Sequence, residues 1–168
     1  MILPVRIYGD PLLRKELPPV DTHEEVLPYI PDMVETMYAD DGIGLSANQA
    51  GIDKRFFVIG KAAFEDGRSD SVFINPVILD ASEEKWDYEE GCLSVPGIRE
   101  TVERPLTITV RYMDAAGKER EETMTDLAAR VFQHEFDHIN GVFFVDRISA
   151  LRHSLISSKL KKLADQKR

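Results

Sequence analysis

Apolar and polar residues alternate most clearly in residues 106–113, where Leu106, Ile108 and Val110 are separated by polar side chains. A period of two is typical of a half-buried strand, because successive side chains of a strand point to opposite faces. The turn-forming residues "DAAGKE" then lead into "REETMT", which predicts a hairpin. The apolar runs "RFFVIG" and "SVFINPVIL" predict two more strands, the second broken at Asn75 and Pro76.

Three other segments show helical spacing of their apolar residues. The first begins with Thr22 and Glu25 in a capping-box pattern and ends at Gly42. Pro28 and Pro31 are expected in its first turn or at a kink, because proline cannot donate the helical hydrogen bond. This segment is therefore predicted to be a helix.

The second helical segment runs from Asp126 to Ile139, and Gly141 suits the C-cap position that follows it. The third, residues 147–168, is predicted to be an amphipathic basic helix. Its predicted apolar face consists of Ile148, Leu151, Leu155 and Leu163.

The predicted fold class is α+β, with short, mostly antiparallel strands around a central helix and another helix at the C-terminal end. A length of 168 residues without repeats fits one domain, residues 1–168. No run approaches the roughly 18 apolar residues of a membrane helix, so no membrane partner is expected. The lone Cys92 excludes an intrachain disulfide, and the N-terminus lacks a signal-like region, so a cytoplasmic location is expected.

The charge is unevenly distributed. A net charge of −9 argues against general binding to DNA or other nucleic acids. From Arg152 onward, six basic residues and one acid give a tail of +5, which leaves −14 for the rest of the chain. The basic tail fits a solvated last helix, whose dipole favours cations at its C-terminal end. It also fits a docking segment for RNA, such as that of a ribosome.

The segment "QHEFDHING" contains the most specific chemical pattern. His134 and His138 stand four residues apart, so both project from one face of the predicted central helix and can reach one metal ion. Glu135 lies about 100° around that helix, where it can act on a water without being a ligand. The alternative interpretation is a helix whose histidines are simply hydrogen-bonded.

A catalytic divalent-metal site usually takes three protein ligands, so a third ligand is needed. The extended protease pattern H-E-x-x-H-x-x-G-x-x-H fails here, because Phe144 stands where the last histidine belongs. No glutamate follows residue 138. Downstream, Asp146, His153 and Asp165 remain as weak candidates.

Cys92 is the stronger upstream candidate. It lies in "YEEGCLSVPG", a glycine-containing stretch between strand-like segments. A thiolate is a good ligand for a borderline-soft ion. A lone cysteine is often only a small buried hydrophobe, but the polar neighbours Glu89, Glu90 and Ser94 favour the ligand interpretation.

Three motifs, "GIGLSANQ" (42–49), "EGCLS" (90–94) and "QHEFDH" (133–138), occur in this order. Together they closely resemble those of the peptide deformylase family, and the resemblance covers nearly the whole chain. That family removes the formyl group from the N-terminal formyl-methionine of nascent bacterial polypeptides. The first motif usually reads GxGLAAxQ, so Ser46 is a departure, expected to alter a hydrogen bond without abolishing activity.

The resemblance implies one ferrous ion per chain, replaceable by zinc or nickel, held by Cys92, His134 and His138. It also implies that Glu135 is the general acid and base. Gln49 and the backbone N–H of Leu93 are then expected to stabilise the oxyanion. Asp137 is expected to form a structural ion pair, with Arg104 as the candidate partner.

Further residues are candidates for binding formyl-methionyl nascent peptides. These are Ile43, Gly44, Tyr88, Glu89, Gly91, Arg99, Arg130 and Val131. A position in the core is the alternative for Ile43 and Val131, and a solvated side chain is the alternative for Arg99. The basic C-terminal helix is the candidate for contact with the ribosome.

Two other functions remain as alternatives. A zinc endopeptidase of the HExxH type would not depend on Cys92, but it lacks a downstream ligand. A metal-stabilised binding module that docks through the basic tail would have no need of Glu135 or Gln49.

Overall fold

The structure is a computed structural model, and it describes residues 1–166. Five strands form one antiparallel sheet in the order β1-β2-β3-β6-β7. The other two strands, β4 and β5, pair with each other in a separate antiparallel hairpin. The strands are β1 (Gly44–Ser46), β2 (Phe56–Ile59), β3 (Ser71–Ala81), β4 (Lys85–Cys92), β5 (Val95–Pro105), β6 (Thr107–Met113) and β7 (Glu119–Thr125).

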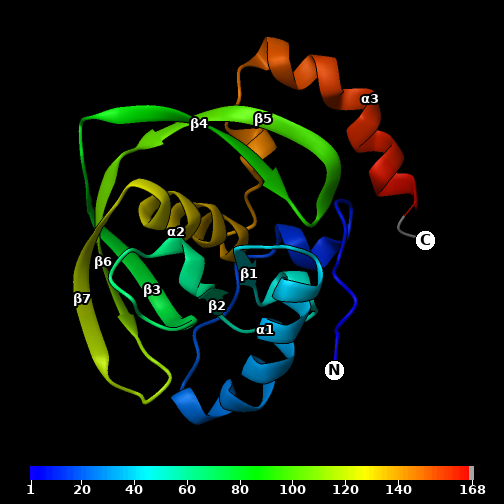
Figure 1. Cartoon of the computed structure of the whole chain (residues 1–168). Coiled ribbons are helices and arrows are strands. Elements are labelled where there is room, and N and C mark those ends of the chain that lie inside the picture. The colour runs from blue at the N-terminus through cyan, green and yellow to red at the C-terminus, as the bar shows by residue number, and fades with distance from the viewer. Residues whose placement is uncertain (167–168) are drawn as a thin grey trace.

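Within residues 1–166, the remaining regular elements are three α-helices and six short 3-10 turns. The helices are α1 (Ile30–Ala39), α2 (Asp126–Ile139) and α3 (Ala150–Gln166). The 3-10 turns are η1 (Pro11–Arg14), η2 (His23–Glu25), η3 (Leu27–Tyr29), η4 (Asn48–Ala50), η5 (Lys61–Ala63) and η6 (Phe144–Asp146). In Figure 1, α2 lies between the five-stranded sheet and the β4–β5 hairpin, while α3 lies at the outside. The predicted α+β class with a central helix is therefore confirmed.

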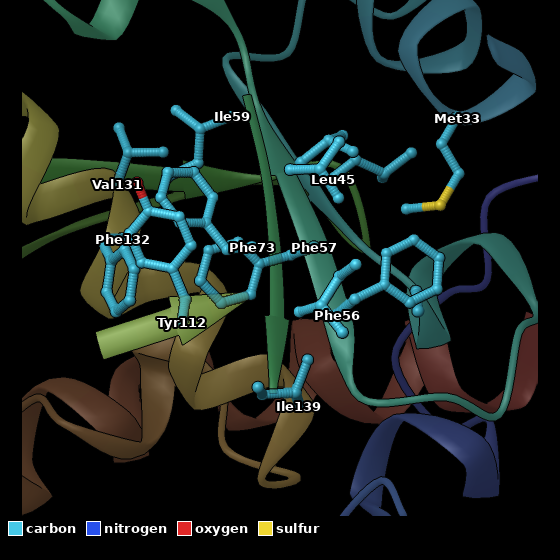
Figure 2. Close-up of a cluster of buried hydrophobic side chains, with 14 of the residues drawn as sticks. Met33, Leu45, Phe56, Phe57, Ile59, Phe73, Tyr112, Val131, Phe132 and Ile139 are labelled. Carbon is cyan, nitrogen blue, oxygen red and sulfur yellow. The ribbon is translucent and has the colours of Figure 1, made fainter. Parts of the chain in front are cut away.

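The position of α2 is fixed by aromatic packing against the sheet. Phe132 makes edge-on contacts with Phe57 of β2 and Phe73 of β3, at centroid distances of 5.1 and 5.3 Å. All three rings are fully buried, and Figure 2 shows them together with Tyr112. Because Phe132 faces the sheet, His134 and His138 face the β4–β5 hairpin. The apolar face of α2 thus decides where its histidines point.

Two predicted elements differ in detail. The first helix begins only at Ile30, because the prolines divide the preceding segment into the turns η2 and η3. The capping residue Glu25 accepts a hydrogen bond from the Thr22 N–H at 2.7 Å, but this cap closes a 3-10 turn. The strand predicted to break at Asn75 instead continues as β3 with a shift in register. Asn75 takes a φ of 49° there, and its side chain bonds both backbone groups of Val20.

The C-terminal helix also differs from its prediction. It begins at Ala150 rather than at 147, because Ser149 Oγ accepts a hydrogen bond from the Arg152 N–H. The predicted residues 167 and 168 lie outside the described ones. Arg152 also forms an ion pair with Glu100 of β5 at 2.9 Å, which turns this side of α3 toward the hairpin.

The buried face of α3 differs from the predicted apolar face. Ile156 and Leu160 are buried, whereas Leu151 and Leu155 are 70% and 61% exposed. The predicted apolar face was therefore wrong at Leu151 and Leu155. Periodicity alone could not distinguish the two faces, because the packing of Ile156 and Leu160 against the hairpin decides which face is covered. None of the helices in residues 1–166 is long and apolar enough to cross a membrane.

The two leucines offer a matched test of this orientation. Leu160→Ala is expected to lower the free energy of unfolding by about 2–3 kcal/mol, because it removes a buried side chain from the cluster between α3 and the hairpin. Leu155→Ala, the same change on the exposed face, is expected to alter it by less than about 0.5 kcal/mol. Urea denaturation of both variants measures the difference, and equal losses would contradict the assigned face.

Candidate metal centre and active-site cavity

Cys92, at the end of β4, meets two histidines of α2 that lie far from it in the sequence. The Nε2 atoms of His134 and His138 lie 3.2 Å apart, and Cys92 Sγ lies 3.2 Å from His138 Nε2. The three ligand atoms all lie within 4.8 Å of one another. They form the only cluster of this kind among the described residues.

This geometry fits a divalent ion. With zinc-like bond lengths, tetrahedral coordination places the ligand atoms about 3.3–3.6 Å apart, close to the separations observed here. Burial lowers the pKa of His138 well below its ordinary value, so its imidazole is neutral, which is the form that binds metals. The separations of the three ligand atoms would allow Cys92 and the two histidines to hold one ion.

The downstream candidates for a third ligand are engaged elsewhere or replaced. Asp146 pairs with Arg14 at 2.6 Å, away from the histidines. Phe144, which stands where a protease would have its third histidine, packs its ring against His134 at a centroid distance of 5.9 Å. The chain thus uses this position for aromatic packing.

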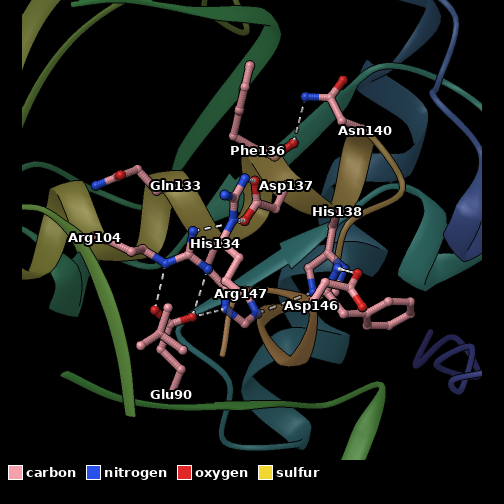
Figure 3. Close-up of polar contacts among 12 residues, drawn as sticks. Glu90, Arg104, Gln133, His134, Phe136, Asp137, His138, Asn140, Asp146 and Arg147 are labelled. Carbon is pink, nitrogen blue, oxygen red and sulfur yellow. Dashed lines mark hydrogen bonds and ion pairs between the residues drawn. The ribbon is translucent and has the colours of Figure 1, made fainter. Parts of the chain in front are cut away.

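His134 is oriented by a buried carboxylate. Glu90 Oε1 lies 2.8 Å from His134 Nδ1, which leaves Nε2 of the same ring for a metal. Figure 3 shows Glu90 held at the same time by the guanidinium of Arg104. Burial alone would raise the pKa of Glu90, but the hydrogen bonds with His134 and Arg104 hold that pKa well below its ordinary value. Glu90 is therefore ionised.

The network extends from Glu90 through further ion pairs. Arg104 also pairs with Asp137 at 2.8 Å, as predicted, and Asp137 accepts two hydrogen bonds from Arg147. Arg130 donates to Glu90 at 2.6 Å and to the carbonyls of Val102 and Trp86. Its guanidinium is thus committed to the network, although Arg130 also lines the cavity.

Glu135 is buried beside the glycine-rich strand β1. A Cβ at Gly44 would lie 2.8 Å from Glu135 Oε2, so only glycine allows this approach. Burial raises the pKa of Glu135 to about 7. No group within residues 1–166 donates to its buried Oε1. A carboxyl group in this setting can accept and return a proton near neutral pH.

Gln49 directs its amide nitrogen at the same centre. Its Nε2 donates to Ser94 Oγ at 3.1 Å and lies 3.5 Å from Cys92 Sγ. Its Oε1 accepts from the Ser46 N–H at 3.0 Å, so the oxygen faces away from the cluster. The Gln49 side chain thus places a neutral donor beside the candidate ligands.

A cavity of about 560 Å³ opens onto this centre, a size typical of sites for small ligands. It brings together all but one of the residues that the sequence selected. Those lining it are Ile43, Gly44, Gln49, Tyr88, Glu89, Gly91, Cys92, Leu93, Arg99, Arg130, Val131, His134 and Glu135. The exception, His138, lies fully buried behind the cavity wall.

The structure adds residues that the sequence reasoning missed. Leu127 also lines the cavity. It lies one helical turn before Val131 and two turns before His134, so helical spacing predicts it on the same face. Ile98 of β5 contributes from the opposite wall. Glu90 was noted only as a polar neighbour, although it stands two residues before Cys92 in a strand and hence on the same face.

The geometry described so far is that of a cavity beside a cluster that could hold a metal ion, and comparisons with known proteins identify its family. The family model described as polypeptide deformylase matches residues 2–154. A peptide deformylase of Pseudothermotoga lettingae is 48% identical over 167 residues, covering 99% of this chain and 94% of the relative.

Solved structures show the same likeness. The crystal structure of peptide deformylase from Thermotoga maritima matches with a TM-score of 0.82 and 46% identity, covering 89% of this chain and 99% of that one. A peptide deformylase from Legionella pneumophila matches with a TM-score of 0.86 and 40% identity, covering 96% and 95%. The chain belongs to the polypeptide deformylase family. It is a hydrolase of that metal-dependent family.

Metal binding through the thiolate can be tested directly. Cys92→Ala is expected to reduce bound zinc from about one ion per chain to less than about a tenth, because it removes one of three ligands. His153→Ala, a histidine substitution on α3 outside the cluster, is expected to keep full occupancy. Metal analysis after loading and gel filtration measures both, and a fully loaded Cys92→Ala protein would exclude the thiolate as a ligand.

The buried carboxylate supplies a second test. Glu90→Gln is expected to weaken metal affinity at least about tenfold, because His134 loses its charged partner. It is also expected to lower the free energy of unfolding by about 3 kcal/mol, because the buried Arg130 loses its counter-charge and Arg104 keeps only Asp137. Glu89→Gln, the same change at the exposed neighbouring residue, is the control for both measurements. Matching values for the two variants would contradict the role of Glu90.

Proposed function

We propose that this chain removes the formyl group from the N-terminal formyl-methionine of nascent polypeptides and releases formate. The observation that carries the proposal is the placement of Glu135 and Gln49 beside the Cys92–His134–His138 cluster at the end of one cavity. A binding module would have no need of such groups. An endopeptidase of the HExxH type would have no need of Cys92, which here lies against both histidines.

The proposed reaction is hydrolysis of a formamide. Cys92, His134 and His138 would hold a divalent ion, which when bound would supply an activated water and polarise the formyl carbonyl. Glu135 takes a proton from the attacking water and passes it to the departing amine as the carbon–nitrogen bond breaks. Its pKa of about 7 suits both halves of this transfer.

The oxyanion of the tetrahedral intermediate would be stabilised by neutral donors. Gln49 Nε2 points toward the cluster, and Leu93 lies in the cavity wall directly after Cys92. Removing one such donor typically lowers kcat about 10²–10³-fold. An uncharged amide suits this place, because it does not compete with Cys92 or the histidines for the ion.

The substrate is proposed to enter along the cavity between α2 and the hairpin. Ile43, Leu127 and Val131 offer apolar surface for the methionine side chain. Gly44 and Gly91 allow the peptide backbone to approach closely, while Tyr88 completes the wall. The exposed pair of Glu89 and Arg99, at 2.8 Å, stands at the rim where the rest of the peptide leaves.

Iron in the ferrous state is the proposed physiological ion, with zinc or nickel as replacements. The donor set of one thiolate and two imidazoles suits borderline-soft ions of this kind. We propose that the reaction takes place in the cytoplasm, within the single catalytic domain of residues 1–168. The basic residues exposed on α3, such as Lys159 and Lys162, are proposed to approach the ribosome, which carries the nascent chain.

The function is tested by measuring formate release from a short formyl-methionyl peptide. Anaerobically purified protein, loaded with iron or nickel, is expected to release formate, and Glu135→Gln is expected to lose at least about a thousandfold of this activity with its metal retained. Cleavage of internal peptide bonds without formate release would favour an endopeptidase. A fully loaded parent that releases no formate would exclude the proposed function.

A further inference from the structure

Ser46, which stands where the family motif usually has alanine, lies in a buried network of amides. Its hydroxyl donates toward Asn48 Oδ1 at 2.7 Å and Gln49 Oε1 at 2.9 Å. Ser46, Asn48 and Gln49 are all at most 2% exposed. Water cannot readily replace these hydrogen bonds, so the direction of each amide depends on the protein groups around it.

The partners fix which way both amides face. Asn48 Nδ2 donates to the carbonyl of His138 at 2.7 Å, so its oxygen must face Ser46. Gln49 Oε1 accepts the Ser46 N–H, so its oxygen faces Ser46 as well. Two acceptor oxygens therefore converge on one hydroxyl, and neither amide can donate to the other's oxygen. The single Ser46 hydroxyl proton is shared between them, and the Asn48 oxygen has no other donor among the described residues.

This arrangement couples the candidate oxyanion donor to the helix that carries the histidines. Because a carboxamide is planar, holding Gln49 Oε1 in place also fixes where Nε2 points, which is toward Ser94 and Cys92. On the other side, Asn48 joins the network to α2 at the carbonyl of His138. The path therefore runs from α2 through Asn48 and Ser46 to Gln49.

We propose that Ser46 is a positioning residue for hydrolysis, whose hydroxyl fixes the Gln49 amide relative to α2. The proposal rests on the proposed function, because it takes Gln49 to be the oxyanion donor. Alanine at position 46 would keep the backbone bond to Gln49 but would leave the buried Asn48 oxygen without its donor. The Gln49 amide would then adopt a wider range of directions.

The kinetic test compares two buried hydroxyls. Ser46→Ala is expected to lower kcat about tenfold with little change in KM, which is less than the loss from removing an oxyanion donor outright. Thr36→Ala removes a buried hydroxyl on α1 that bonds the Asp32 carbonyl and the Leu3 N–H, and is expected to keep full kcat. Full kcat in Ser46→Ala would overturn the inference.

A double-mutant cycle tests whether Ser46 acts through Gln49. Gln49→Ala is expected to lower kcat strongly, and adding Ser46→Ala to it is expected to cause no further loss. A tenfold loss that persists in the Gln49→Ala background would overturn the inference. If Gln49→Ala lowers kcat strongly and Ser46→Ala does not lower it, the inference about Ser46 is overturned, whereas the proposed function is not.

A readout without substrate separates this inference from the proposed function. The chain has three glutamines, so side-chain ¹⁵N labelling of the zinc-loaded protein yields few amide resonances. Ser46→Ala is expected to shift and broaden the Gln49 pair. Gln133 of α2, which donates to the carbonyls of Pro105 and Ala129, is expected to stay unchanged. An unchanged Gln49 pair would overturn the inference, whatever the activity of the parent.

Discussion

The buried carboxylate of Glu90 is the interaction on which the rest of the site depends. It lies on β4 and is held by Arg104 of β5 and by Arg130 and His134 of α2. A charge buried in this way is tolerable only because its partners are charged and well placed, and each partner in turn depends on it. The hairpin and the helix are therefore locked together at the point where Cys92 meets the histidines.

The pairing of buried charges also explains why a helix rich in polar residues can lie at the centre of the molecule. One face of α2 carries Phe132 against the sheet, and the opposite face carries Arg130, His134 and Asp137 against the hairpin. With both faces covered, these polar side chains are largely buried, so they bond one another. The charged network therefore allows α2 to be buried while it presents its histidines on one side.

Much of this arrangement was predictable from the sequence, because the informative patterns are local. Helical spacing located α2 with its correct ends, and the period of two located β6. The motif around Cys92 led to the cluster that the structure assembles. The catalytic roles of Glu135 and Gln49 stay predictions that rest on the family resemblance and on their placement.

What the sequence could not provide depends on contacts between distant segments. Leu155 is exposed because the opposite face of α3 packs Ile156 and Leu160 against the hairpin, and no local pattern encodes that packing. Continuation of β3 through Asn75 likewise depends on the backbone of Val20. The role of Glu90 could not be predicted from the sequence, because its partners come from two other elements, β5 and α2.

The candidate ligands come from two different layers of the fold, with Cys92 at the end of the hairpin and both histidines on the helix. An ion bound by all three would cross-link these layers, much as a disulfide joins two chain segments. Binding to the folded chain alone shifts the folding equilibrium by mass action. The supply of metal would therefore set how long the protein persists in a cell as well as how fast it works, so that scarcity of the ion would act on its abundance.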